Sequence, residues 1–240
     1  MAISPIFSRL AQWISSVLYP RLCPICGERV EGETDYHRPR YICKHCIEML
    51  PRTEQAAERG NSTEDIFHHH PQFATGAAFL FYTKDDTIRT VVHTFKYRRQ
   101  PEIAYQLAHT AATDFLQSDF FDEIDCIIPV PLHKKRFRSR GYNQSEYIAQ
   151  ALSDVTGIPM DTSHLTRERN NPQQALKSGT ERKQNVEGIF AVNHPEELYR
   201  KHILLVDDVL TTGSTLLSAI TTLEVCKGAK FSVFVLAKAR

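Results

Sequence analysis

Residues 202–217, HILLVDDVLTTGSTLL, constrain the fold of this 240-residue chain more than any other stretch. The apolar residues 203–206 have the length and composition of a buried parallel strand. Asp207 and Asp208 follow directly, and a strand of an open α/β sheet would deliver them to the crevice beyond its carboxyl end. The small residues 211–215 come next, before apolar residues that recur at helical spacing. The stretch therefore predicts a strand, an acidic pair and a helix N-terminus whose free N–H groups favour a phosphate.

An acidic pair beside a phosphate site can hold vicinal hydroxyls, or help to hold a Mg²⁺ that the ligand brings. A simpler interpretation is a loop in which the aspartates cap the helix and the threonines favour the turn. A P-loop for nucleoside triphosphates is disfavoured, because G-x-x-x-x-G-K-[ST] does not occur and no lysine follows Gly213.

The same stretch resembles the 5-phosphoribosyl-1-pyrophosphate (PRPP) signature of type I phosphoribosyltransferases. The resemblance implies that Asp207 and Asp208 are catalytic-site residues that bind the ribose 2′- and 3′-hydroxyls. It also implies that the following residues bind the 5′-phosphate, namely Val209, Leu210, Thr211, Thr212, Gly213, Ser214 and Thr215.

The cysteines predict a metal site near the N-terminus. They form two C-x2-C pairs, Cys23 with Cys26 and Cys43 with Cys46, separated by sixteen residues. Each pair can hold one side of a Zn²⁺, and four thiolates close the tetrahedron of a structural site. A redox C-x-x-C would need only one pair beside a βαβ pattern. We therefore expect structural zinc, and, with no export signal, a cytoplasmic protein.

Two domains are expected: an N-terminal helix with a zinc ribbon in residues 1–60, and an α/β domain in residues 61–240. The polar segment 52–72 is interpreted as a solvated linker. No apolar run is long enough for a membrane span. In the larger domain we expect strands at 74–82, 126–128, 189–192, 203–206 and 231–237, and helices at 88–95, 102–117 and 143–155.

A basic run occupies residues 133–140, although the net charge of the whole chain is only +1. The run follows the expected strand at 126–128 and precedes a helix for which Asn143 is the candidate N-cap, with Glu146 three residues on. It would therefore lie at the same sheet edge as Asp207, where it supplies positive potential for a pyrophosphate or a nucleic-acid backbone. The alternative is an ordinary solvated surface.

Taken together, these motifs closely resemble the ComF (ComFC/GntX) family of competence-associated phosphoribosyltransferase-like proteins. The resemblance rests on the four cysteines, FKYR at 95–98, PVP to RGYNQ at 129–144, NPQQ…R…NV at 171–186, and the acidic pair with its loop. It implies an α/β fold, with a type I phosphoribosyltransferase-like parallel sheet flanked by helices and preceded by a small four-cysteine zinc ribbon.

The resemblance also implies further site residues. Those for pyrophosphate or another anion are Val130, Pro131, Leu132, Lys134, Arg136, Arg138 and Arg140. Residues 167–188 resemble the flexible loop that closes over PRPP, with Gln174, Lys177 and Arg182 as candidates.

Two functions follow from the resemblance. The first is Mg²⁺-dependent transfer of a phosphoribosyl group from PRPP to a base, in a family linked to DNA uptake and natural transformation. The second is a non-catalytic module that binds single-stranded DNA, or proteins of the uptake machinery. That module would use residues 133–140 and 96–99, with Phe137, Tyr142 and Tyr97 as stacking aromatics.

Overall fold

The computed structural model describes residues 20–32, 38–82, 87–168 and 189–239. The chain divides into two compact units, residues 1–50 and 51–240, and each is described by itself. The predicted boundary after residue 60 lies later in the chain than this division. The predicted N-terminal helix falls in residues 1–19, outside the described residues.

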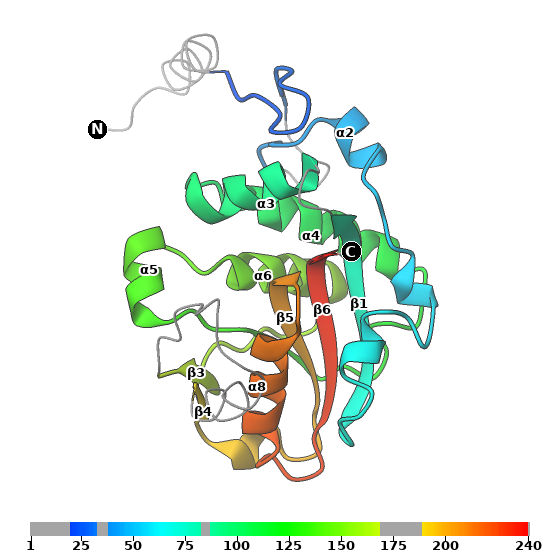
Figure 1. Ribbon diagram of the computed structural model, residues 1–240, viewed down its shortest axis with the longest axis vertical. Coiled ribbons are helices and arrows are strands. Elements are labelled where there is room, and N and C mark those ends of the chain that lie inside the picture. The colour runs from blue at the N-terminus through cyan, green and yellow to red at the C-terminus, as the bar shows by residue number, and fades with distance from the viewer. Residues whose placement is uncertain (1–19, 33–37, 83–86, 169–188, 240) are drawn as a thin grey trace, which may run out of the picture. The chain divides into compact units, whose positions relative to one another are not determined.

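In the described part of the second unit, four parallel strands form the central sheet, in the order β1-β6-β5-β2. Figure 1 labels the first three of them, β1, β6 and β5, side by side. The interiors of the four strands are apolar almost throughout, because a parallel sheet is covered on both faces. This confirms the parallel α/β sheet and the strands expected from the apolar runs. The strands are β1 (Phe73–Tyr82), β2 (Cys126–Pro129), β5 (His202–Leu210) and β6 (Lys230–Ala239).

Helices cover both faces of this sheet. On one face α4 and α6 pack against each other and against the strands, and α3 packs on α4 and β1 (Figure 1). On the other face α8 packs through its apolar side chains against the strands. The helices are α3 (Thr87–Tyr97), α4 (Glu102–Phe115), α5 (Lys134–Arg140), α6 (Gln144–Thr156) and α8 (Ser214–Leu223). Among the described helices, none is both long and apolar enough to cross a membrane.

A short antiparallel pair, β3 (Leu165–Arg167) with β4 (Phe190–Val192), stands beside α8. The sequence predicted β4 but assigned all of 161–188 to a loop, so it missed β3. Three residues of mixed polarity carry too little periodicity to indicate a strand. Residues 169–188 lie outside the described residues, and with them the candidates Gln174, Lys177 and Arg182.

The segment 52–72 is not the solvated linker that its composition suggested. Its first residues pair with the free edge of β1 through backbone hydrogen bonds. Further along, side chains satisfy the backbone groups of β1 that a neighbouring strand would otherwise bind. Gln55 Oε1 accepts from Ala78 N at 3.0 Å, and Asn61 Nδ2 donates to Gly76 O at 2.9 Å. Polar residues here serve the sheet edge rather than solvent. Those buried in this way are Thr53, Gln55, Asn61, Thr63 and Glu64.

Candidate functional site

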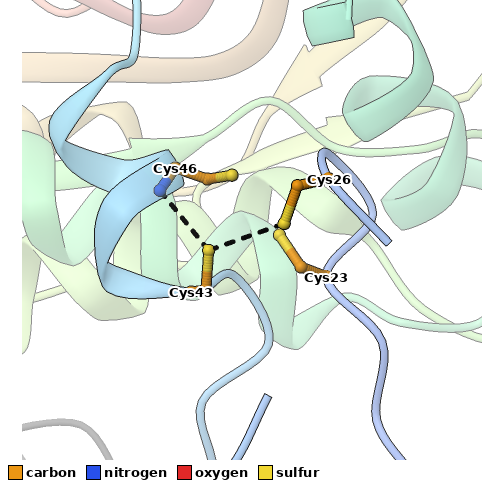
Figure 2. A group of neighbouring side chains, drawn as sticks. All are labelled: Cys23, Cys26, Cys43 and Cys46. Atoms are coloured by element: carbon orange, nitrogen blue, oxygen red, sulfur yellow. Dashed lines mark hydrogen bonds between the residues drawn. The ribbon is translucent and has the colours of Figure 1, made fainter. Parts of the chain in front are cut away.

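The first unit contains a cluster of four thiols. The Sγ atoms of Cys23, Cys26, Cys43 and Cys46 all lie within 4.8 Å of one another (Figure 2). A tight turn follows the first pair, and Gly27, with φ of 77°, donates its N–H to Cys23 O at 2.9 Å. The second pair begins the short helix α2 (Lys44–Glu48), where Cys46 N donates to Cys43 Sγ at 3.4 Å.

The electrostatics of this cluster favour a cation. Burial, followed by the neighbouring thiol groups, raises the pKa of Cys46 above its ordinary value. Four thiolates in so small a space repel one another unless a positive ion lies between them. The structure therefore brings the four predicted ligands together in an arrangement that can hold a metal ion.

In the second unit the acidic pair lies on β5, which extends past it to Leu210. Successive strand residues point to opposite faces, so the two side chains leave the strand in different directions, although the first turn of α6 contacts both. Asp207 lines an open, solvent-accessible pocket together with residues 209–216. Asp208 is only 4% exposed and is turned toward α3 and α6. From the sequence the two carboxylates were expected to have the same role, whereas in the structure only Asp207 lines the pocket.

Both carboxylate oxygens of Asp208 are engaged by donors from other helices. Lys96, in the last turn of α3, places Nζ at 2.9 Å from Asp208 Oδ1. Gln144, the first residue of α6, donates from Nε2 to Asp208 Oδ2 at 2.5 Å. Arg140 in turn donates to Gln144 Oε1. This chain of contacts fixes the orientation of the Asp208 carboxylate.

Asp207 is held by one oxygen. Its Oδ1 accepts from Ser145 Oγ at 3.1 Å and from the backbone N–H of Asp208 at 2.8 Å. Desolvation, and then the neighbouring Asp208 carboxylate, raise the pKa of Asp207 to about 7, while Lys96 acts in the opposite direction. The pocket thus presents a carboxyl group that is close to its point of titration at neutral pH.

The N-terminus of α6 supports the acidic pair because Asn143 caps it, as the sequence predicted. Asn143 Oδ1 accepts from Ser145 N at 3.2 Å, and its Nδ2 donates to Val130 O at 3.1 Å. This buried side chain therefore joins the residues after β2 to the first turn of α6. It sets Gln144 and Ser145 beside the aspartates.

The predicted phosphate loop, Thr211 to Thr215, leads directly into α8, whose cap residue is Gly213. Gly213 has φ of 74°, and a Cβ there would lie 2.5 Å from Ile66 Cγ2. Both the backbone conformation and the close contact require glycine. Thr211, Thr212 and Ser214 are exposed, so their hydroxyls and the first N–H groups of α8 are available to an anion.

The predicted anion-binding residues lie in the segment that follows β2 and on α5. Val130 is buried and the side chains of Pro131 and Leu132 are partly buried, whereas α5 has no buried residue. Among the described contacts, none links Lys134 or Arg138 to the acidic pair. Arg140 does join the network, and its guanidinium also lies 5.3 Å from the centre of the Tyr97 ring.

Arg167, at the end of β3, is the first residue of the segment expected as the flexible loop, but it was not among the candidates named there. Its Nε is buried and has no hydrogen-bond partner among the described residues. Its guanidinium lies 5.2 Å from the centre of the Phe190 ring. Desolvation, and then the charge of Arg136, lower the pKa of Arg167, while Asp207 opposes them. A buried cation whose Nε has no partner among the described residues therefore acts on the pocket-facing carboxyl group.

Gln144 and Ser145 were also missed as site residues, and Lys96 was expected only as part of the basic segment 96–99 in the DNA-binding alternative. A topological signal existed for Gln144 and Ser145: α6 follows β2, and β2 is the neighbour of β5 in the sheet. The first turn of α6 must then lie at the same sheet edge as the acidic pair. No comparable topological signal existed for the contact of Lys96 with Asp208, or for Arg167, which is the first residue of the segment 167–188 expected as the flexible loop.

Comparison with known proteins gives consistent relatives. The phosphoribosyl transferase domain family matches residues 141–240. The chain is 36% identical over 197 residues to DNA utilization protein YhgH of Salmonella typhimurium, covering 81% of this chain and 74% of that protein. It is 33% identical over 198 residues to competence protein F of Haemophilus influenzae, covering 80% and 75%. It is 31% identical over 156 residues to competence protein ComFC of Bacillus subtilis, covering 65% and 61%.

Proposed function

The chain belongs to the family of DNA utilization protein YhgH and competence protein F, and on that premise we propose that it is a phosphoribosyltransferase. In this proposal it binds PRPP with Mg²⁺ and transfers the phosphoribosyl group to a base. The observation that carries the proposal is the pocket in which Asp207 and residues 209–216 meet. A carboxyl group at one side and a helix N-terminus at the other match a sugar that carries both hydroxyls and a phosphate.

The two ends of the ribose phosphate have separate partners in this proposal. Thr211, Thr212, Ser214 and the N–H groups at the start of α8 bind the 5′-phosphate, where the helix dipole favours negative charge. Asp207 accepts hydrogen bonds from the ribose hydroxyls. The carboxylate oxygens of Asp208 already bind Lys96 and Gln144, so Asp208 does not bind the sugar in this proposal. Its backbone N–H donates to Asp207 Oδ1 instead.

The reaction is a displacement at the anomeric carbon. The bond between C1 and the pyrophosphate oxygen breaks, its electron pair leaves with pyrophosphate, and a nitrogen of the acceptor base bonds to C1 while the proton of that nitrogen passes to water. Positive charge develops on the ribose, so the nearby Asp207 carboxylate stabilises the transition state. Arg140 and Arg167 supply positive charge on the side of the leaving group.

PRPP carries its Mg²⁺ with it in this proposal, and that ion supplies further charge neutralisation for the leaving pyrophosphate. Because Lys96 and Gln144 engage both oxygens of Asp208, we assign no magnesium ligand to the chain itself. For the first unit we propose Zn²⁺, held by Cys23, Cys26, Cys43 and Cys46, since four sulfur ligands leave no open position for catalysis. Because these four cysteines are not paired in disulfides, we also propose a cytoplasmic location.

The test is calorimetric titration of the zinc-loaded protein with PRPP, with and without Mg²⁺. The double variant Asp207→Asn/Asp208→Asn should lose binding and keep the zinc content of the wild type. The matched control is Glu54→Gln/Glu58→Gln, which neutralises two exposed carboxylates and should bind normally. Absence of PRPP binding by the folded wild type, or binding retained by the double aspartate variant, contradicts the assignment.

A second candidate function, binding of single-stranded DNA, is favoured by α5. Phe137 is 45% exposed in the middle of this basic helix. An exposed aromatic ring among cationic side chains is the combination that binds single-stranded nucleic acid, because the ring stacks on a base and the cations contact the backbone. The names of the relatives point to DNA as well. Tyr142 does not contribute, because it is partly buried and its hydroxyl donates to Phe95 O.

This second function predicts binding of an oligonucleotide that weakens steeply with salt and survives the double aspartate substitution. Phe137→Ala should weaken it, whereas Leu116→Ala, at a comparably exposed apolar residue after α4, should not. Equal loss in both variants would count against α5 as the binding surface.

A further inference from the structure

Lys96 forms an ion pair that is withdrawn from solvent. Its Nζ lies 2.9 Å from Asp208 Oδ1, and the two side chains are 19% and 6% exposed. Buried ion pairs contribute little net stability, because desolvation of the two charges offsets much of their attraction. A pair of this kind beside a ligand pocket therefore calls for an explanation other than stability.

The ion pair fixes Asp208 together with the amide of Gln144. Lys96 engages Oδ1 and Gln144 engages Oδ2, so the carboxylate has no freedom to rotate toward the pocket. The two donors come from the end of α3 and the start of α6, elements far apart in the sequence. Only Asp207 is then left to face a ligand.

The ion pair also controls charge. Two adjacent carboxylates carry a charge of −2, which opposes both their own ionisation and the approach of a strongly anionic ligand. Lys96 cancels one of these charges. The other groups that act on Asp207 are Asp208 on β5, Ser145 on α6 and Arg167 on β3. Of the cations among them, Lys96 is the one in direct contact with the acidic pair.

We propose that Lys96 is a positioning residue, which fixes the Asp208 carboxylate and favours the ionised form of Asp207, so that Asp207 can present a carboxylate to the ribose hydroxyls from neutral pH upward. The part that concerns the ribose rests on the proposed function, whereas the part that concerns ionisation does not. Lys96 itself touches no reacting atom in this proposal.

Two substitutions separate charge from hydrogen bonding. Lys96→Gln keeps a donor for Asp208 but removes the charge, and Lys96→Arg keeps both. Lys227→Gln is the control, because it removes a charge from an exposed lysine in the turn before β6. If Lys96→Gln does not fold, Lys96→Met provides the neutral variant.

The direct measurement is a pH titration of the carboxyl ¹³C resonance of Asp207 in aspartate-labelled protein, assigned from its loss in Asp207→Asn. Lys96→Gln should move the midpoint up by about one pH unit, because an attractive charge has been removed. Lys96→Arg and Lys227→Gln should titrate as the wild type does. An unchanged midpoint in Lys96→Gln overturns the proposal.

PRPP affinity measured across the same pH range tests the consequence for binding. As the solution is acidified, the affinity of Lys96→Gln for PRPP should begin to fall at a higher pH than the affinity of the wild type does. Lys96→Arg should show the wild-type pH profile. A loss of affinity that is equal at every pH would reduce Lys96 to a purely structural role. If the wild type binds no PRPP, the proposed function fails, and the carboxyl titration alone decides the role of Lys96.

Discussion

The unfavourable ionisation of Asp207 should be measurable as a change in stability. Asp207→Asn keeps the shape of the side chain, and its amide oxygen can still accept from Ser145 Oγ and Asp208 N. The substitution removes a negative charge that is desolvated and lies beside the Asp208 carboxylate. Desolvation and this neighbouring charge are the two causes that raise the pKa of Asp207 to about 7. We therefore expect Asp207→Asn to be more stable than the wild type above neutral pH.

The sign follows from proton binding. The folded protein keeps a proton on Asp207 up to about pH 7, whereas the unfolded chain loses it near the ordinary value of 3.8. The stability that this proton contributes is complete below pH 4 and is lost as the pH rises to 7. The interval corresponds to roughly 4 kcal/mol, at about 1.36 kcal/mol for each pH unit.

The expected gain is smaller than this limit. Part of the unfavourable energy belongs to Asp208, and the amide accepts weaker hydrogen bonds than a carboxylate does. A gain of about 1–2 kcal/mol at pH 8 is therefore expected, which raises the melting temperature by about 3–6 °C in a protein of this size. At pH 4.5 the two proteins should melt together, because the wild-type carboxyl group is already protonated.

Thermal unfolding followed by circular dichroism at pH 4.5 and pH 8 gives the comparison, with the zinc-loaded wild type, Asp207→Asn and Glu58→Gln measured side by side. Glu58 is exposed, so its substitution should leave both melting temperatures unchanged. A lower stability of Asp207→Asn at pH 8, or the same difference at both pH values, would refute the electrostatic reasoning.

Three further outcomes follow from the contacts. Gly213→Ala should destabilise the protein by about 1–3 kcal/mol in urea unfolding and weaken PRPP binding, because its Cβ would clash with Ile66; unchanged unfolding would contradict the loop geometry. Asn61→Ala should lower stability by about 2 kcal/mol in the same assay, since it leaves Gly76 O without its donor, and a neutral result would mean that water replaces it. Cys46→Ser should reduce the zinc content measured by mass spectrometry while the PRPP affinity of the second unit persists; retained zinc would rule out the four-thiol site.

Much of the fold could be predicted because buried parallel strands need continuous apolar runs. The runs at 203–206 and 231–237 predicted β5 and β6 within a few residues. The pattern of polar residues was less reliable. Gln55 and Asn61 read as solvated, yet their side chains are hydrogen-bonded to the edge of β1. Composition shows how polar a segment is, but it does not show whether its polar side chains form hydrogen bonds with water or with the protein backbone.

The candidate site was predictable to the extent that it is local in the sequence. The acidic pair and the phosphate loop lie within one short stretch, and Asn143 was expected as a helix cap. The partners of the pair are distant: Lys96 and Gln144 meet Asp208 only through the packing of α3 and α6 on the sheet. No spacing rule covers such contacts, so they had to be found in the structure.

The same distant contacts bear on the choice between the two proposed functions. A surface that only binds nucleic acid needs exposed cations and aromatic rings, which α5 already offers. It gains nothing from a buried carboxylate with its own lysine, a combination that apolar side chains of similar volume would replace with equal or greater stability. The Lys96–Asp208 pair is understandable if Asp207 must stay ionised and correctly oriented beside a phosphate-binding loop. The internal charge arrangement therefore favours a small phosphorylated sugar as the ligand of this pocket, and leaves nucleic acid to the outer face of α5.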